Sequence, residues 1–174
     1  MKKLVWAVLA VAFFAFNSHA QELSKLDVSG SYSYMRITTV GLSMNGFSAS
    51  AAYNANNWFA AVGDFGFYHA SPGGVGKSVE SYTFGPRFSI RGSSKVVPYF
   101  QALVGASHLP PAFLTLSSAN PFTFNFGAGA DIAIPGHDQF AFRPQIDNML
   151  WRVSGVTVNE VRIGAGIVYH FGEK

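Results

Sequence analysis

The residues most suggestive of chemistry lie between positions 69 and 80. His69 and Ser71 are separated by one residue, and Glu80 follows nine residues after the serine. A serine hydroxyl becomes a nucleophile when a base lies within hydrogen-bond reach and a third group orients that base. However, Ser71 is followed by Pro72-Gly73-Gly74, which is typical of a turn. We therefore interpret this group as polar residues at a hairpin tip, and we predict no catalytic residues and no enzyme.

Other candidates for cofactor or metal chemistry are weaker. The chain has no cysteine, and its five histidines do not have metal-ligand spacing. The segment Gly73–Lys77 lacks the spacing of a phosphate-binding loop, and it joins two predicted strands where such a loop needs a strand and a helix. We predict no cofactor and no metal site.

Six charged residues occupy alternate positions within segments that are otherwise apolar or small. Three are acids and three are bases, and they sort into hairpins. By hairpin, they are Asp64 with Arg87, Asp131 with Arg143, and Asp147 with Arg162. Counting outward from each connection places the members of each pair nearly opposite, and opposite residues on neighbouring strands lie about 5 Å apart. We therefore expect each acid to pair with the base of its own hairpin.

The elements that position these charges show the period of a β-strand, most clearly in residues 159–171. One face of this segment is apolar and ends in two aromatic residues, whereas Arg162 and His170 lie on the other face with small residues. At about thirteen residues it exceeds the roughly 9–11 that a tilted strand needs to cross a membrane. Soluble strands average about 5–6 residues.

The same alternation recurs upstream and predicts eight strands in total. The other seven are residues 27–36, 45–54, 57–68, 79–91, 96–107, 121–134 and 138–150. We predict an all-β fold, an eight-stranded antiparallel up-and-down transmembrane β-barrel. Proline removes a ladder hydrogen bond, so we expect bulges or bends at Pro86, Pro98 and Pro144.

The predicted connections alternate in length. Short ones at 55–56, 92–95 and 135–137 alternate with longer ones at 37–44, 69–78, 109–120 and 151–158. This layout is typical of outer-membrane barrels, whose short turns face the periplasm. An even strand number then places both chain ends on the periplasmic side, where the first and last strands can pair.

The first twenty residues have the features of a secretory signal peptide. Lys2 and Lys3 precede an apolar run, residues 4–16, and Ser18-His19-Ala20 matches a cleavage site. We predict a signal peptide at 1–20 and one barrel domain at 21–174, exported through the periplasm to the outer membrane. Cleavage leaves ten basic residues against nine acidic ones, so the charge gives no reason to expect a nucleic-acid partner.

The chain resembles the small eight-stranded outer-membrane barrels of the OmpA/OmpX kind over residues 21–174. The resemblance rests on Gly166, Tyr169 and Phe171 of the last strand and on the segments 63–66 (Gly-Asp-Phe-Gly) and 84–87 (Phe-Gly-Pro-Arg). It implies that the last strand carries an assembly signal for the barrel-assembly machinery. We also expect contact with outer-membrane lipid and lipopolysaccharide, and we expect a monomer.

The interior of such a barrel is just wide enough for side chains to fill. Charges enclosed there must be paired and hydrogen-bonded. We predict an interior plugged by salt bridges, with Tyr99, Gln101, Asn125 and Gln145 completing the hydrogen bonds. The balanced signs favour a plug over the alternative, a narrow ion path lined by the same groups.

The predicted function is structural or in surface interaction, without catalysis. Two other classes remain open besides the narrow pore. Some eight-stranded barrels are lipid A deacylases that use a His-x-Ser pair with a glutamate, which resembles His69, Ser71 and Glu80. A soluble lipocalin-like carrier would require apolar residues inside the barrel and polar residues outside.

Overall fold

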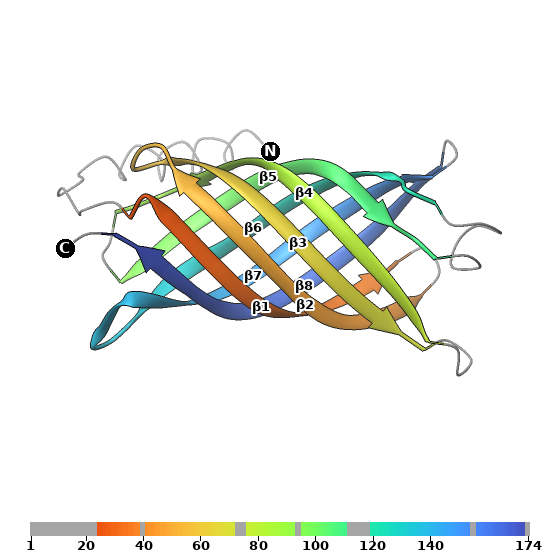
Figure 1. Cartoon of the computed structure of the whole chain (residues 1–174), viewed down its shortest axis with the longest axis horizontal. Helices are drawn as coiled ribbons and strands as arrows, with labels where there is room; N and C mark the ends of the chain where they lie inside the picture. The colour runs from red at the N-terminus through yellow and green to blue at the C-terminus, as the bar shows by residue number, and fades with distance from the viewer. Residues whose placement is uncertain are drawn as a thin grey trace, which may run out of the picture.

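The structure is a computed structural model, and it describes residues 24–38, 41–71, 76–92, 95–110, 119–153 and 156–172. The predicted signal peptide lies outside these residues. The described strands are β1 (Leu26–Ile37), β2 (Leu42–Asn54), β3 (Phe59–Ala70), β4 (Lys77–Ser89), β5 (Val96–His108), β6 (Phe122–Ile134), β7 (His137–Val153) and β8 (Val156–Phe171). Each is antiparallel to its neighbours, and β1 pairs with β8, which closes the barrel (Figure 1). The predicted fold class is confirmed.

Strict alternation of side chains separates the inside of the barrel from the outside. In β1 and β3, buried and exposed residues alternate along almost the whole strand. Aromatic side chains face outward, as shown by Phe47 at 67% and Phe84 at 66% exposure, while Ser31 and Ser33 are buried inside. The predicted faces are therefore present, with an apolar exterior and a polar lining. Within the described residues, no helix is long and apolar enough to cross a membrane.

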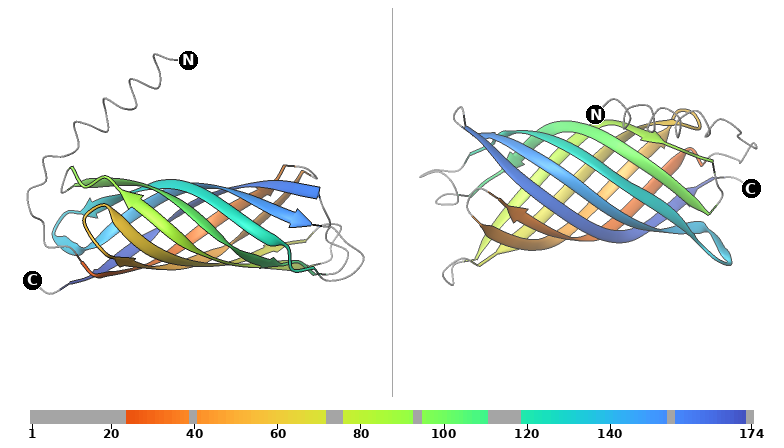
Figure 2. Two further views of the ribbon diagram at one scale, coloured as in Figure 1. Left: turned by 90° about the horizontal axis from the view of Figure 1, so that it is seen from above. Right: turned by 180° about the vertical axis from the view of Figure 1, so that it is seen from behind.

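The two ends of the barrel carry different connections (Figure 2). We call the end where β1 begins and β8 finishes the proximal end; its connections are residues 55–58, 90–95 and 135–136. The distal end has connections 38–41, 71–76, 109–121 and 154–155. The predicted alternation in length is wrong except for 109–121. The ladders continue into the expected loops, since Trp151 pairs with Val158 between β7 and β8.

Pro86 and Pro144 each interrupt strand pairing on one side of their strand, but the register of that pairing does not change. Pro86 pairs with Ala61 on β3, and the register between β4 and β5 is the same on both sides of the gap beside it. Pro144 likewise pairs with Ala165 on β8, and pairing with β6 resumes in register. Because proline lacks only the N–H, a strand can lose pairing on one side and keep it on the other. The expected bulges at these prolines are therefore wrong.

The barrel interior has two parts. Charged and amide side chains fill its middle and proximal parts, whereas the distal part holds an apolar group. We call this group the distal cluster; its buried members are Met35, Ile37, Met44, Tyr68, Ala70, Val79, Leu109, Met149, Trp151 and Val158.

Candidate functional site

Arg162 of β8 connects three strands from the middle of the barrel and is fully buried. Its Nε donates to Asp147 Oδ2 on β7 at 2.9 Å, and its Nη1 donates to Asp64 Oδ1 on β3 at 2.9 Å. Nη1 also donates to the Tyr68 hydroxyl at 2.7 Å. Because β3 and β8 are not neighbours in the sheet, the contact with Asp64 crosses the lumen.

Asp147 extends this arrangement to β5 and β4. Its carboxylate accepts hydrogen bonds from Gln101 Nε2 at 3.2 Å and from Gln145 Nε2 at 3.3 Å. The Gln101 carbonyl oxygen accepts two bonds from Arg87, at 3.1 Å from Nε and 2.9 Å from Nη2. Arg87 therefore donates to the Gln101 side-chain amide, and Gln101 in turn links it to the Asp147 carboxylate.

A second charge pair occupies the proximal part of the lumen. Arg143 binds Asp131 through two hydrogen bonds of 2.6 and 2.8 Å, and its Nη1 reaches Ser29 on β1 at 3.3 Å. The ring of Tyr99 lies 4.4 Å from the Arg87 guanidinium carbon and 5.0 Å from that of Arg143. Both cations can interact with this ring. The Tyr99 hydroxyl donates to Gln145 at 3.3 Å.

We call this connected set the lumen network. Its members are Asp64, Tyr68, Arg87, Tyr99, Gln101, Asp131, Arg143, Gln145, Asp147 and Arg162.

Glycines on the inner face make room for these cross-lumen contacts. A Cβ at Gly127 of β6 would lie 2.0 Å from Asp147 Oδ1, and one at Gly129 would lie 2.6 Å from the Tyr99 hydroxyl. Their missing side chains let residues of β5 reach residues of β7 across β6. A Cβ at Gly166 of β8 would lie 2.2 Å from Ser31 Oγ, so this position is equally restricted. At these three positions the interior has no room for a side chain.

The structure contains two of the three predicted hairpin pairs, Asp131 with Arg143 and Asp147 with Arg162. The third, Asp64 with Arg87, is wrong. Asp64 lies opposite Thr83 and Arg87 lies opposite Ala60, four residues away along the ladder. Asp64 therefore pairs across the lumen with Arg162.

Of the four residues expected to complete the hydrogen bonds, Asn125 does not. Neither its amide nitrogen nor its amide oxygen has a hydrogen-bond partner among the described residues. The other three, Tyr99, Gln101 and Gln145, lie within the lumen network.

Sequence reasoning missed two inward-facing acids, Asp27 and Glu160. Asp27 accepts a hydrogen bond from Asn54 at 2.7 Å and pairs with His170 at 2.7 Å across the β1–β8 seam. Glu160 is fully buried, and neither carboxylate oxygen has a hydrogen-bond partner within the described residues. The strand alternation could have identified both acids. Asp27 lies two residues before inward-facing Ser29, and Glu160 lies two residues before inward-facing Arg162, so each shares the inner face.

The His69 group has only part of the geometry of a hydrolytic site. Ser71 Oγ lies 3.4 Å from His69 Nε2, while His69 Nδ1 contacts Ser78 Oγ at 3.1 Å. Glu80 accepts a hydrogen bond from Tyr82 instead of orienting the imidazole. Within the described ranges, no group of three or more acidic or histidine side chains is placed to hold a metal ion.

The residues expected to form the assembly signal lie at the proximal end of β8. Tyr169 packs edge-on against Phe171, with ring centroids 4.5 Å apart, and against Phe140 at 5.0 Å. Phe171 is 48% exposed. The strand thus presents an aromatic edge outside the barrel, while Gly166 packs close to β1.

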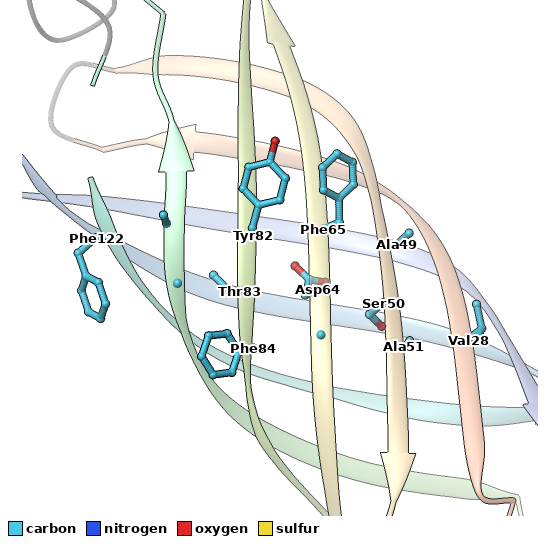
Figure 3. A pocket seen from close by; sticks show the side chains of 13 residues that line it. Val28, Ala49, Ser50, Ala51, Asp64, Phe65, Tyr82, Thr83, Phe84 and Phe122 are labelled. Atoms are coloured by element: carbon cyan, nitrogen blue, oxygen red, sulfur yellow. The ribbon is translucent and has the colours of Figure 1, made fainter. Parts of the chain in front are cut away.

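A shallow groove of about 780 Å³ lies on the outside of the barrel (Figure 3). Small residues such as Ala49, Ala51 and Gly63 form its floor, and Phe65, Tyr82, Phe84 and Phe122 stand around it. Its walls belong to the apolar exterior. Ser50, Asp64 and Thr83 also line it, from neighbouring positions on β2, β3 and β4, and Asp64 is bound to Arg162 in the lumen.

The sequence matches no protein-family model and no curated protein. Solved structures are similar in fold. Neisserial surface protein A (NspA) aligns with a TM-score of 0.59 and 17% identity over 84% of this chain and 96% of that one. The N-terminal β-barrel domain of Pseudomonas aeruginosa OprF aligns at 0.60 and 15% over 87% and 100%. P. aeruginosa OprG aligns at 0.56 and 9% over 88% and 99%. The chain therefore has the fold of small eight-stranded outer-membrane barrels, as the sequence resemblance predicted.

Proposed function

We propose that this chain is a monomeric outer-membrane barrel with a sealed interior, and that its role is structural or in surface interaction, without catalysis. The observation that carries the proposal is the lumen network inside an apolar exterior. Arg162 joins β3, β7 and β8, and the Tyr99 ring lies against Arg87 and Arg143. An ion crossing the lumen would have to break paired, buried charges and would find no ring of one sign to replace its hydration.

Two measurements test this proposal in sequence. The barrel is first recovered in detergent from an outer-membrane fraction and run on a gel with and without boiling; a shift in migration is expected of a closed barrel. Single-channel recording in planar bilayers should then stay at baseline. Steady conductance that is lost or changed in Arg162→Met would contradict the seal and favour the narrow pore. A soluble protein without a gel shift would contradict membrane location.

The distal rim supports lipid, including lipopolysaccharide, as the partner. Each distal hairpin carries at least one outward-facing hydrogen-bonded polar pair. The pairs are Tyr34–Ser43 at 2.7 Å, His69–Ser78 at 3.1 Å, His108–Asn120 at 2.8 Å and Asn148–Asn159 at 2.9 Å. Polar groups above an apolar belt match the level where lipid headgroups meet hydrocarbon.

Two exposed arginines, Arg36 of β1 and Arg152 of β7, add positive charge at this rim. The double variant Arg36→Gln/Arg152→Gln should retain less lipopolysaccharide during purification, while Lys25→Gln, which removes one positive charge at the proximal end, serves as the control. If both variants retain the same amount of lipopolysaccharide, the two rim arginines do not bind it and the proposal is contradicted.

The other functional classes give different results. A barrel enzyme acting on outer-leaflet lipid would lose its effect on lipid A in His69→Ala, whereas we expect unchanged lipid A. A lipocalin-like carrier would need a polar exterior, which the exposed Phe47 and Phe84 do not provide.

For the proposed assembly signal, Phe171→Ala should slow insertion by the barrel-assembly machinery. Phe126→Ala, which removes an equally exposed outward aromatic on β6, is the control.

A further inference from the structure

Unpartnered polar groups gather around one methionine in the distal half of the lumen. Met149 of β7 lies directly opposite Asn125 on β6 and Glu160 on β8, and Trp151 is the next inward residue along β7. Within the described residues, both side-chain polar atoms of Asn125, both oxygens of Glu160 and the Trp151 indole nitrogen are buried without a hydrogen-bond partner. Native interiors satisfy nearly all such groups, so a group of them in one place calls for ordered water or a bound ion.

The residues around these groups are rich in thioether sulfur. The sequence has four methionines, and the three after Met1 are all fully buried members of the distal cluster. Met35 of β1 faces Met44 across the β1–β2 ladder. Across the β1–β8 ladder Met35 faces Arg162 and Ile37 faces Glu160, so Met35 is the diagonal neighbour of Glu160. The carboxylate therefore has one methionine beside it, a second on the diagonal and a third next to that one.

The charges of the lumen also call for a cation at this place. Arg162, the nearest inward base along β8, binds Asp64 through Nη1 and Asp147 through Nε, while its Nη2 has no hydrogen-bond partner among the described residues and makes no ion pair with Glu160. Glu160 has no base of its own among the described residues. Buried charges in proteins are paired or coordinate metals.

We propose that Glu160, Met149 and Met35 form a binding site for a soft monovalent metal cation of the Cu⁺ class. Thioether sulfur selects soft cations of this kind, whereas Ca²⁺ and Mg²⁺ require several oxygen ligands. The single carboxylate neutralises the single charge, so the occupied site carries no net charge into the apolar cluster. Asn125 faces Met149 from β6, on the side opposite Glu160, and its unpartnered side-chain oxygen could add a further donor. This inference is independent of whether the barrel conducts ions.

The test uses Ag⁺, which shares the charge and sulfur preference of Cu⁺ and undergoes no redox change in air. The barrel, labelled with ¹³C at the methionine methyl groups and purified in detergent, is titrated with Ag⁺ in chloride-free buffer. We expect one Ag⁺ retained per chain after desalting, with the methyl signals of Met149 and Met35 shifting in step. Met149→Leu keeps the side-chain volume, and it and Glu160→Gln should each abolish retention.

Asp138→Asn, which removes an exposed carboxylate at the proximal end, is the matched control and should bind normally. Heat-shifted migration of each variant on a gel establishes that it is folded. Three results would overturn the proposal: no retained Ag⁺ in the folded wild-type barrel, retention that is unchanged in folded Glu160→Gln, or displacement of Ag⁺ by equimolar Na⁺, Ca²⁺ or a primary amine. If the protein is not a membrane barrel or its interior is not sealed, the gel and conductance measurements would show it, and the Ag⁺ titration would not.

Discussion

The two halves of the lumen bury polar groups in opposite ways. In the lumen network, Asp147 accepts hydrogen bonds from three side chains. In the distal half, Glu160 is as deeply buried and has no described partner. The acid in the first half is held by groups that would be left unsatisfied without it, whereas the acid in the second half lies beside the apolar distal cluster with no hydrogen-bond partner among the described residues. The same substitution should therefore have opposite consequences in the two halves.

The largest effect is expected at Arg162. Arg162→Met removes the base that binds Asp64 and Asp147 and leaves two buried acids without it. Breaking a buried ion pair in this way costs about 3–5 kcal/mol of unfolding free energy. Urea titration of the barrel in detergent measures it, with the outward-facing Arg152→Met as control, expected within about 0.5 kcal/mol. Equal stabilities would mean that the network does not hold the barrel together.

A matched acid-to-amide pair compares the two halves directly. Asp147→Asn places an NH₂ group among three donors, so it should lower the unfolding free energy by roughly 1.5–3 kcal/mol. Glu160→Gln, measured without added metal, replaces a buried carboxyl group that has no hydrogen-bond partner among the described residues and should be neutral or stabilising. The same urea titration compares them. If Glu160→Gln is as costly as Asp147→Asn, the two halves do not differ in the way described.

Glycine substitutions test how tightly the network is packed. Gly127→Ala would place a Cβ 2.0 Å from Asp147 Oδ1, and overpacking of this kind costs about 1–3 kcal/mol. Gly63→Ala, on the outer face with nothing within 4 Å of the added Cβ, should be close to neutral. Similar losses at both positions would point to backbone effects and not to the interior.

The smallest effect is expected at the distal rim. Tyr34→Phe removes the hydroxyl that contacts Ser43 at 2.7 Å, yet the pair is exposed, so stability should change by less than about 0.5 kcal/mol. A thermal melt with tryptophan fluorescence is sufficient to check it. A larger loss would show that the rim pairs stabilise the barrel in addition to facing the headgroups.

The strands and their faces could be predicted because a strand alternates its side chains with a period of two, and the chain keeps that period in all eight segments. Contacts across the lumen could not. The Asp64–Arg162 pair depends on strand tilt and on how the closed sheet brings β3 and β8 together, and neither is visible in the alternation. Asp27 and Glu160 were predictable in principle, because they share the parity of residues already placed inside.

The β1–β8 seam has a consequence for the order of assembly. His170–Asp27, Arg143–Ser29 and Arg162–Asp64 join residues 143, 114 and 98 positions apart in the chain, whereas Arg143–Asp131 spans 12. Contacts of long sequence separation form late, because the entropy of closing the chain must be overcome first. We expect these three contacts to form only when the first and last strands meet. They then act as a latch that must be released before the barrel can reopen, so their strength would govern the lifetime of the finished barrel more than the speed at which it folds.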